Sequence, residues 1–320
     1  MSRTYDCLCA GIIVADTICQ PLPSMPPSGA LVKTDKIEFS IGGCPANLAV
    51  DLVRLGMNVA LSGRVGQDLF GREVRDLLTA AGVDTSRLEM STTAVTSSTF
   101  VLNVKGEDRR FIHCVGANGE YDGSELTEAS IRSAKSLFVG GFCLIESLTP
   151  ERVIRLFRIA RDAGVVTVLN VVISETTDTM AWLNPVLPWT DIFICNNDEA
   201  HRITQKSVPL EQALALQKLG AKTAIVTQGE RGAVLIGPDG VQLRSGVYPV
   251  EPVDSTGTGD AFAAGYLYGV LRGESYASCL KLGTALGASC VRSVGATTGV
   301  FNAAELADFV GSHTLSIEQI

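Results

Sequence analysis

The chain has 320 residues, of which 26 are Lys or Arg and 34 are Asp or Glu, so its formal net charge is −8. Hydrophobic residues make up 46% and charged residues 19% of the chain, a balance that excludes an intrinsically disordered protein. The 32 glycines follow no period, which excludes a collagen-like chain, and the acidic balance argues against a nucleic-acid-binding surface.

Several further classes of protein do not fit the sequence. No apolar stretch reaches the roughly 18 residues of a membrane span, and the N-terminus lacks the basic stretch and cleavage site of a signal peptide. The nine cysteines are odd in number and contain no CxxC pair, which favours reduced thiols over disulfides or zinc. Only three histidines are present, so a His-built metal site is not expected. We therefore predict a cytoplasmic protein without membrane or nucleic-acid partners.

The first part of the chain predicts alternating strands and helices around a Pro-rich loop. A buried strand is expected over 7–14, ending at Ala15 and Asp16, and prolines argue against helix or central strand over 21–27. The hydrophobic patterns that follow predict strands at 31–41 and 58–65 and helices at 46–55 and 69–81.

After these helices the character of the chain changes. Residues 92–104 are rich in Thr, Ser and Val and favour a strand, 106–108 a turn, and 110–115 a return strand. Since no helix intervenes, we expect a small sheet separate from the main one. This small sheet would form a lid with strands contributed by about 29–41 and 92–116.

From residue 124 onward strands and helices alternate regularly. This pattern predicts an α/β fold with a doubly wound, mostly parallel sheet and helices on both faces. We interpret residues 1–320 as a single domain that carries the lid. The strands are expected at 136–139, 165–172, 191–195 and 223–227, with a short hairpin over 233–250, and the helices at 150–163 (with Thr149 as N-cap), 198–203, 210–219, 257–271 and 276–292.

The loop from Asp254 to Asp260 is the strongest functional signal. Its glycines, Gly257 and Gly259, precede an Ala-rich helix, where free backbone N–H groups favour an anion. A first-turn aspartate such as Asp260 also complements a helix dipole, but that role needs neither the glycines nor Asp254. We therefore predict that Asp260 deprotonates a hydroxyl group while the backbone stabilises a transferred phosphoryl group.

A second glycine loop runs from Gly42 to Asn47 and is weaker evidence when taken alone. A Gly-Gly turn with a proline before a helix is a common structural junction. The Asn47 amide can both donate and accept hydrogen bonds, and Asp16 could share its pocket. A carboxylate that accepts hydrogen bonds from hydroxyl groups suits a polyol ligand.

Together the two loops resemble the signatures of the ribokinase-like (PfkB) carbohydrate kinases. Gly42-Gly43-Cys44-Pro45-Ala46-Asn47 is similar to the first signature, and the segment from Asp254 to Asp260 followed by Ala264-Gly265 is similar to the second. The resemblance runs from Gly11 to about Gly299. The chain contains neither a Walker-type GxxxxGK[ST] loop nor a GxGxxG after the first strand, so other nucleotide-binding classes are not supported.

The resemblance implies a role for each matching residue in an ATP- and Mg²⁺-dependent sugar kinase. Asp260 would be the base, and the N–H groups of Gly257, Thr258 and Gly259 would form an anion hole. Residues that would bind the acceptor sugar are Asp16, Gly42, Gly43 and Asn47, and those that would contact ATP are Thr227 and Gly229 of a segment that otherwise predicts a tight turn.

The same comparison gives meaning to two groups of possible metal-binding residues. Asn196 and Glu199, in Asn196-Asn197-Asp198-Glu199, would organise the water shell of magnesium, although the residues alone favour a helix cap. A monovalent cation such as K⁺ is also implied. Its loops would contain Asp254, Thr256, Ser293, Gly295 and Gly299.

The chain departs from the family pattern at two positions, and its mixture of features that resemble ribokinases and fructokinases leaves the sugar open. Thr258 stands where the family usually has Ala, and Cys44 follows Gly43 where ribokinases have Lys. We predict transfer of the γ-phosphoryl group of ATP to a primary hydroxyl of a small sugar or sugar derivative. The alternatives are a nucleoside kinase of the same fold and a sugar- or nucleotide-binding regulator without turnover.

The predicted lid also suggests an oligomer. Ile37, Phe39, Val101 and Phe111 would place apolar side chains on a small sheet, where one face stays uncovered without a ligand or a second subunit. We therefore expect a homodimer formed through the lid.

Overall fold

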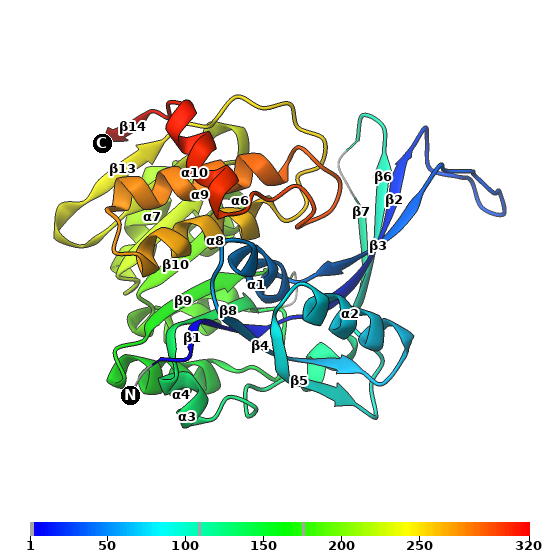
Figure 1. The fold of residues 1–320 in the computed structure, drawn as a ribbon, viewed down its shortest axis with the longest axis horizontal. Helices are drawn as coiled ribbons and strands as arrows, with labels where there is room; N and C mark the ends of the chain where they lie inside the picture. Colours follow the sequence, from blue (N-terminus) through cyan, green and yellow to red (C-terminus); the bar gives the residue numbers. More distant parts are fainter. Residues whose placement is uncertain (1–2, 108–109, 175–176) are drawn as a thin grey trace.

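A computed structural model describes residues 3–107, 110–174 and 177–320. Its largest element is a ten-stranded sheet with helices on both faces (Figure 1). In order across the sheet, the strands are β14 (Ile317–Gln319), β13 (Gln242–Ser245), β12 (Ala233–Ile236), β11 (Thr223–Thr227), β10 (Ile192–Asn196), β9 (Val166–Val171), β8 (Ala134–Phe142), β1 (Tyr5–Gly11), β4 (Val59–Gly66) and β5 (Asp84–Ser91). Neighbours from β11 to β5 are parallel, and β12 to β14 are antiparallel. The predicted doubly wound, mostly parallel α/β fold is thus confirmed.

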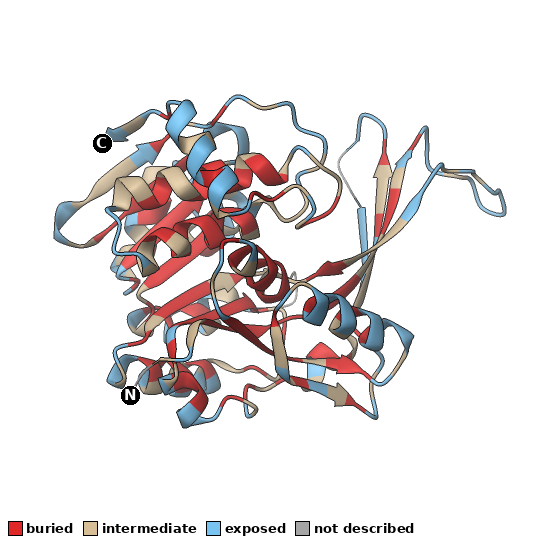
Figure 2. Ribbon diagram, viewed as in Figure 1, coloured by how far each residue is buried: buried red, intermediate tan, exposed pale blue. Residues whose placement is uncertain are grey.

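Two hydrophobic cores lie on opposite faces of the main sheet. Strand β1 contributes to both, because Cys7 and Cys9 point into one core and Leu8 and Ala10 into the other. The buried strands stand out between their helices in Figure 2. The first core is covered by α1 (Cys44–Arg54), α2 (Leu69–Ala80), α8 (Thr258–Leu271), α9 (Tyr276–Cys290) and α10 (Ala303–Ser312), and the second by α3 (Glu128–Arg132), α4 (Pro150–Asp162), α5 (Thr179–Leu183), α6 (Asn197–Thr204) and α7 (Pro209–Lys218).

A second, four-stranded sheet projects from the main body (Figure 1). Its order is β3 (Ile37–Gly42), β2 (Val14–Leu22), β6 (Ser98–Val104) and β7 (Arg110–Cys114). The prediction of a single strand over residues 7–14 was wrong, because this apolar run is divided between two strands in different sheets. The chain leaves β1 at Gly11 and enters the small sheet at Val14, so Asp16 lies on β2 and not in a loop.

Strand β2 extends into the predicted Pro-rich loop as far as Leu22. Pro21 is tolerated there because the pairing of β2 with β6 is irregular between Cys19 and Leu22, and proline in a sheet is found at such bulges. The predicted turn at 106–108 lies only partly within the described residues, because position 108 is outside them.

The strand register corrects the arrangement predicted for the apolar side chains of the lid. Val101 pairs with Phe111, so these two share one face of the small sheet. Ile37 and Phe39 lie on the opposite face, because Ile18, which pairs with Val101, also pairs with Glu38 between them. The sequence alone does not give this result, since the pairing of strands from separate segments decides which side chains share a face.

Other differences concern chain segments with weak sequence signals. The edge strand β5, helix α10 and the short strand β14 were not predicted. Thr149 is the N-cap of α4 as predicted, but its side chain makes no capping hydrogen bond. Within the described ranges, no helix is long and apolar enough to cross a bilayer.

Candidate functional site

The loop before α8 is fixed by a neighbouring loop that precedes α10. Gly257 is the N-cap of α8 with φ 76°, and an added Cβ would lie 2.5 Å from Ala296 Cα. Asp254 connects the two loops, since its Oδ1 accepts from Thr256 N at 2.9 Å and its Oδ2 accepts from Gly295 N at 3.0 Å. Only glycine fits at position 257, because any side chain there would collide with Ala296. The absence of a side chain lets the start of α8 pack against this second loop.

The N-terminal end of α8 is open next to this fixed loop. A Cβ added at Gly259 would meet no heavy atom within 4 Å, so a ligand can approach the backbone there. Of the three predicted anion-hole donors, Thr258 N already lies 3.3 Å from Ser255 O, a long hydrogen bond. The arrangement therefore provides helix N-terminal N–H groups beside free space, as an anion requires.

Asp260 meets the first glycine loop on α1. The Asn47 Nδ2 donates to Asp260 Oδ2 at 2.8 Å, which joins residues 213 positions apart. Burial raises the pKa of Asp260, while hydrogen bonds from the side chains of Asn47 and Cys44 oppose this rise. The other polar atom of the amide, Asn47 Oδ1, is buried and has no hydrogen-bond partner within the described residues. Asn47 thus orients the carboxylate and keeps one acceptor available.

Asp16 reaches the same place from the small sheet. Its carboxylate lies against Gly42, where an added Cβ would be only 2.5 Å from Asp16 Cγ. Burial raises the pKa of Asp16 to about 6; the hydrogen bond with Thr99 lowers this pKa and the charge of Asp260 raises it. Gly43 is the N-cap of α1 beside them, with φ 95°. The four predicted acceptor residues and Asp260 are therefore brought together.

A polar row on the small sheet was missed by the sequence analysis. Asp16, Thr99 and His113 are direct neighbours across β2, β6 and β7 and share one face. The Thr99 hydroxyl and His113 Nδ1 are 3.0 Å apart. A row of this kind becomes visible only when the register is known, because the three residues come from three separate segments.

Asn196 and Glu199 lie at the end of β10, and they do form a helix cap. Asn196 Oδ1 accepts from the backbone N–H groups of Asp198 and Glu199, and Glu199 Oε2 accepts from Asn196 N at 2.9 Å. Burial raises the pKa of Glu199 to about 7, its hydrogen bond with Asn196 N lowers it, and the charge of Asp260 raises it further. Glu199 therefore both completes the helix cap and interacts electrostatically with Asp260.

These carboxylates fit a magnesium ion that keeps its water shell. In the parts of the chain that the structure describes, no cluster of three or more His, Cys, Asp or Glu side chains could enclose a metal. Magnesium often retains several waters and takes only one or two carboxylates, so an enclosing cluster is not required. The charge of Asp260 raises the proton affinity of Glu199, and a nearby dication would relieve this repulsion.

The predicted nucleotide loop lies beside this cap. Thr227, at the end of β11, pairs in register with Asn196. A Cβ at Gly229 would meet nothing within 4 Å, whereas one at Gly232 would lie 2.8 Å from the Ser245 carbonyl carbon. Gly232 therefore serves the turn itself, and Gly229 leaves room for a ligand.

The residues predicted for a monovalent cation also come together in the two loops next to α8. Besides the bond from Gly295 N to Asp254, an added Cβ at Gly299 would lie 2.8 Å from Ser293 Oγ. Sequence analysis missed Cys290, whose buried thiol donates to the carbonyl oxygens of Thr256 and Ala296 at 3.3 and 3.2 Å. This thiol therefore links the loop before α8 to the loop before α10.

Sequence analysis also missed Asp51, one turn along α1 from Asn47. Its side chain is completely buried, and neither carboxylate oxygen has a hydrogen-bond partner within the described residues. Burial raises the pKa of Asp51 and the charge of Asp260 raises it further, while Arg54 lowers it. Nothing in the amino-acid pattern marks this aspartate, because its isolation depends on the packing of α1 against α8.

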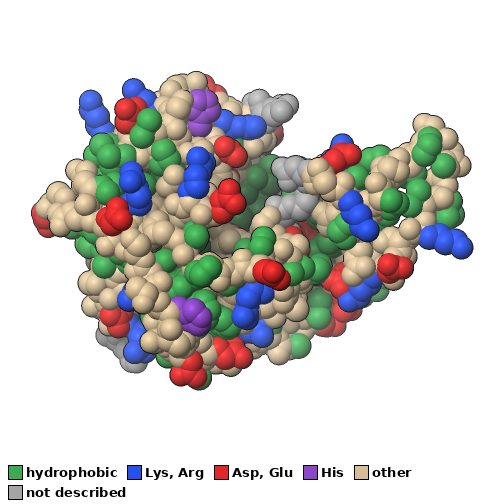
Figure 3. Space-filling view, turned by 90° about the horizontal axis from the view of Figure 1, so that it is seen from above, with side chains coloured by type: hydrophobic (Ala, Val, Ile, Leu, Met, Phe, Trp, Pro, Cys, Tyr) green, Lys and Arg blue, Asp and Glu red, His purple; other side chains and the backbone are tan. Residues whose placement is uncertain are grey.

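An open space separates the small sheet from the loop 293–299. A cavity of about 560 Å³ is lined by Lys36, by the β3 residues Ile37, Glu38 and Phe39, and by Val294 and Thr298. Figure 3 shows the surface hollowed where the projecting small sheet meets the main body. This space lies between the lid and the loop that precedes α10.

Comparisons with known proteins agree with this geometry. Curated relatives include 5-dehydro-2-deoxygluconokinase of Clostridium botulinum (strain Alaska E43 / Type E3), 26% identical over 88% of this chain and 86% of that protein. Ribokinase of Haemophilus influenzae is 26% identical over 94% of this chain and 96% of that protein.

Solved structures show the same fold. Arabidopsis thaliana ribokinase, complexed with ribose and ATP, superimposes with a TM-score of 0.84 at 22% identity and covers 98% of this chain and 100% of that one. An E. coli protein described as a candidate ribokinase II, in complex with ATP and Mg²⁺, gives a TM-score of 0.85 at 24% identity over 97% and 100% of the two chains. The model of the pfkB family of carbohydrate kinases matches residues 5–303. The predicted resemblance is confirmed, and the chain belongs to the pfkB family of carbohydrate kinases.

Proposed function

We propose that this carbohydrate kinase transfers the γ-phosphoryl group of ATP to a primary hydroxyl of a small sugar or sugar derivative. The observation that carries the proposal is the hydrogen bond of 2.8 Å between Asn47 and Asp260, next to the open backbone at Gly259. A carboxylate beside helix N-terminal donors supports the proposal, because phosphoryl transfer to a hydroxyl requires a base and charge stabilisation close together. The relatives named as sugar kinases support the same reaction class.

Asp260 would take the proton of the acceptor hydroxyl during transfer. Its raised pKa makes it a stronger base than an exposed aspartate, and the Asn47 amide holds the receiving oxygen in place. The N–H groups of Gly257, Thr258 and Gly259 would stabilise negative charge on the phosphoryl group as it passes. Asp16 would accept hydrogen bonds from other hydroxyl groups of the sugar, with Gly42, Gly43 and Asn47 completing the acceptor site.

The nucleotide end of the site would be formed by Thr227 and Gly229. Asn196 and Glu199 would hold the hydrated magnesium, which when bound neutralises charge on the phosphates. The structure of an E. coli relative with ATP and Mg²⁺ supports these cofactors. A monovalent cation such as K⁺ would lie at Asp254, Thr256, Ser293, Gly295 and Gly299, where it would strengthen the anion hole.

We also propose that the chain is one domain in which the small sheet closes as a lid over the acceptor. Because Asp16 is carried by β2, closing the lid would bring a sugar-binding group with it and exclude water. The nine free thiols, most of them buried, support a reducing, cytoplasmic location.

The lid further supports a homodimer, although its apolar groups differ from those predicted. Val101 is buried and Phe39 contacts Phe70, with ring centroids 5.6 Å apart. Ile37 and Ile112 remain 58% and 65% exposed on the face away from Asp16. A dimer through this face predicts that Ile112→Glu yields monomers in sedimentation velocity. A wild-type monomer at micromolar concentration would contradict it.

A panel of acceptors tests the function directly. ADP release and thermal unfolding would be measured with pentoses, ketohexoses, their acid derivatives and nucleosides, since a bound ligand raises Tm by mass action. We expect turnover with at least one sugar. Turnover with nucleosides alone would establish the nucleoside kinase, and a Tm rise without ADP release would establish a binding protein that lacks turnover.

A further inference from the structure

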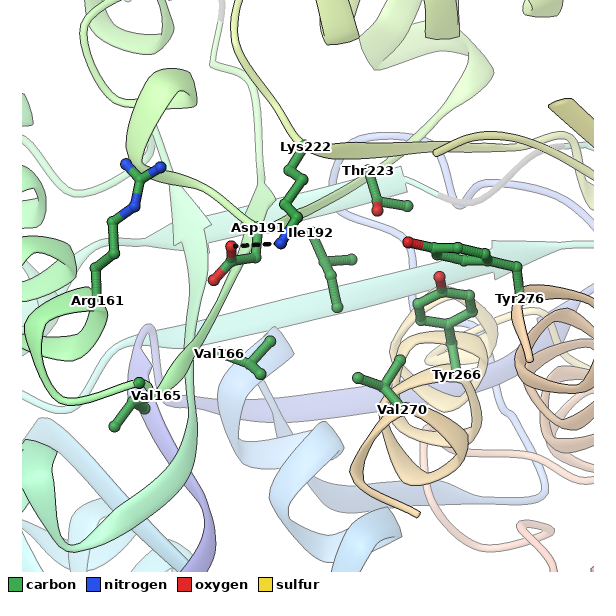
Figure 4. Close-up of a pocket in the computed structure, with 11 residues that line it drawn as sticks. Arg161, Val165, Val166, Asp191, Ile192, Lys222, Thr223, Tyr266, Val270 and Tyr276 are labelled. Atoms are coloured by element: carbon green, nitrogen blue, oxygen red, sulfur yellow. Dashed lines mark ion pairs between the residues drawn. The ribbon is translucent and has the colours of Figure 1, made fainter. Parts of the chain in front are cut away.

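A second cavity lies at the amino-terminal ends of strands in the main sheet, whereas the proposed catalytic site lies at their carboxyl ends. Its volume is about 500 Å³, within the range of small-molecule sites. It is bordered by the starts of β9, β10 and β11 and by α8 and α9 (Figure 4). Ile192 and Thr223 line it, whereas Asn196 and Thr227, at the far ends of the same two strands, belong to the site described above. The two sites are therefore separated by the length of the strands.

The interior of this cavity contains a hydroxyl group that lacks a partner. Tyr266 is 1% exposed, and its hydroxyl has no hydrogen-bond partner among the residues described. In Figure 4 the phenol groups of Tyr266 and Tyr276 both point toward the starts of the strands, near Thr223. A buried hydroxyl without a partner is unfavourable, so an acceptor atom supplied by a ligand would stabilise it here.

Charged side chains at the cavity give it a positive balance. Lys222 is largely exposed, and its Nζ is 3.9 Å from Asp191 Oδ1, the outer limit of an ion pair. Asp191 Oδ2 is engaged by the N–H and hydroxyl of Thr167. Arg161 donates to Pro188 O at 3.1 Å through one nitrogen. Arg161 also lies 5.3 Å from the centre of the Trp189 ring, and in Figure 4 its guanidinium points away from Asp191. The Lys222 ammonium, whose carboxylate partner is distant and already hydrogen-bonded, is therefore the group that is available to an anion.

The remaining walls are apolar. Val166, Ile192 and Val270 line the space between the charged groups and the tyrosines. A ligand that fits must therefore carry its charge at one end and an uncharged body at the other.

We propose that this cavity binds a small organic anion, with a carboxylate or phosphate head at Lys222 and an uncharged body that reaches the Tyr266 hydroxyl. The site goes beyond the sugar kinase reaction and does not depend on it. It shares a helix with that reaction, since α8 carries both Asp260 and Tyr266.

Binding of three matched probes tests the proposal on the full chain. 4-Methoxyphenylacetate and 4-methoxyphenyl phosphate carry the two anionic heads and an ether oxygen that can accept from the Tyr266 hydroxyl, and 4-methoxyphenylacetamide is the neutral control. Saturation-transfer NMR would be recorded with ADP, Mg²⁺ and excess acceptor sugar present, so that the catalytic site is occupied. We expect at least one anion to bind with a Kd of about 1 mM or lower and the neutral probe roughly tenfold more weakly. The anion that binds identifies the preferred head group.

Two variants assign the binding to this cavity. Lys222→Gln should weaken the anion by about fivefold or more, whereas Lys135→Gln, another exposed lysine in an ion pair, should leave it unchanged. Tyr266→Phe keeps the shape and removes the hydroxyl, so the protein should fold and bind the same probe more weakly. The proposal is overturned if no anion binds at millimolar concentration, if the neutral probe binds equally well, or if Lys222→Gln binds like the wild type. Kinase activity is measured in a separate assay, so a failure of anion binding can be distinguished from a failure of the proposed kinase reaction.

Discussion

The contact between Gly42 and Asp16 offers a sharp test of how the acceptor site is built. An alanine at position 42 would place its Cβ 2.5 Å from Asp16 Cγ, 2.7 Å from Asp16 Oδ1 and closer still to Asp16 Oδ2. Ordinary contacts of this kind exceed about 3.4 Å, so the carboxylate would have to move by about 1 Å. The backbone at Gly42 is not in the left-handed region, so alanine is tolerated there apart from this contact.

A displacement of about 1 Å in a group that positions substrate costs roughly 100-fold in rate, or about 2.7 kcal/mol. We therefore expect Gly42→Ala to lower kcat/KM for the acceptor sugar about 100-fold. Nucleotide affinity should change little, because Thr227 and Gly229 lie on other strands. Steady-state kinetics with ADP detection would measure the first quantity, and titration with ATP the second.

Two controls make the result specific. Gly311→Ala, on α10, meets nothing within 4 Å and should behave like the wild type. In an Asp16→Ala background the clash is absent, so adding Gly42→Ala should cost little more. The steric explanation would be refuted by a normal kcat/KM in Gly42→Ala, or by the same 100-fold loss in the Asp16→Ala background.

Three further predictions follow from the charges around the site. The pKa values of Asp16 and Glu199 rise from 3.8 to about 6 and from 4.5 to about 7, so the folded protein binds these protons more tightly than the unfolded chain. The free energy of unfolding should therefore fall as the pH rises from about 4 to about 7, by at most about 3 kcal/mol per group. Urea unfolding at several pH values measures this slope. The prediction is contradicted if the variant with both Asp16→Asn and Glu199→Gln shows the same slope as the wild type. Glu199→Gln alone should raise the magnesium concentration needed for half-maximal turnover, and an unchanged titration would exclude Glu199 from the magnesium site. Asp51→Leu removes a buried carboxyl without a hydrogen-bond partner among the described residues, so it should stabilise the protein by about 1 kcal/mol at pH 8; a loss of stability would show that the carboxyl has a favourable partner.

Local patterns were sufficient to predict the main sheet and both glycine loops. Alternating apolar strands and amphipathic helices determine a parallel sheet, and ligands of such sheets lie at the carboxyl ends of the strands. That rule agrees with the register pairing of Asn196 and Thr227 at the ends of neighbouring strands. It also led us to expect the loops of Asn47 and Asp260 at one edge, where the structure joins them.

The lid and the buried charges could not be predicted in the same way. The apolar run from Cys7 continues without a break into β2, although the chain changes sheets between Gly11 and Val14. Only pairing with β3 and β6 reveals that Asp16 belongs to the lid. Asp51 and Cys290 depend on helices that pack from distant parts of the chain, and no local pattern encodes such contacts.

Exchange of the proposed base is the most direct test of the catalytic role. Asp260→Asn keeps the size of the side chain but cannot accept the proton of the acceptor hydroxyl. We predict that kcat falls by about three orders of magnitude or more, while the Kd values for nucleotide and sugar change modestly. Asp308→Asn, on α10 and exposed, is the matched control and should retain full activity. Near-normal turnover by Asp260→Asn would contradict the proposed mechanism.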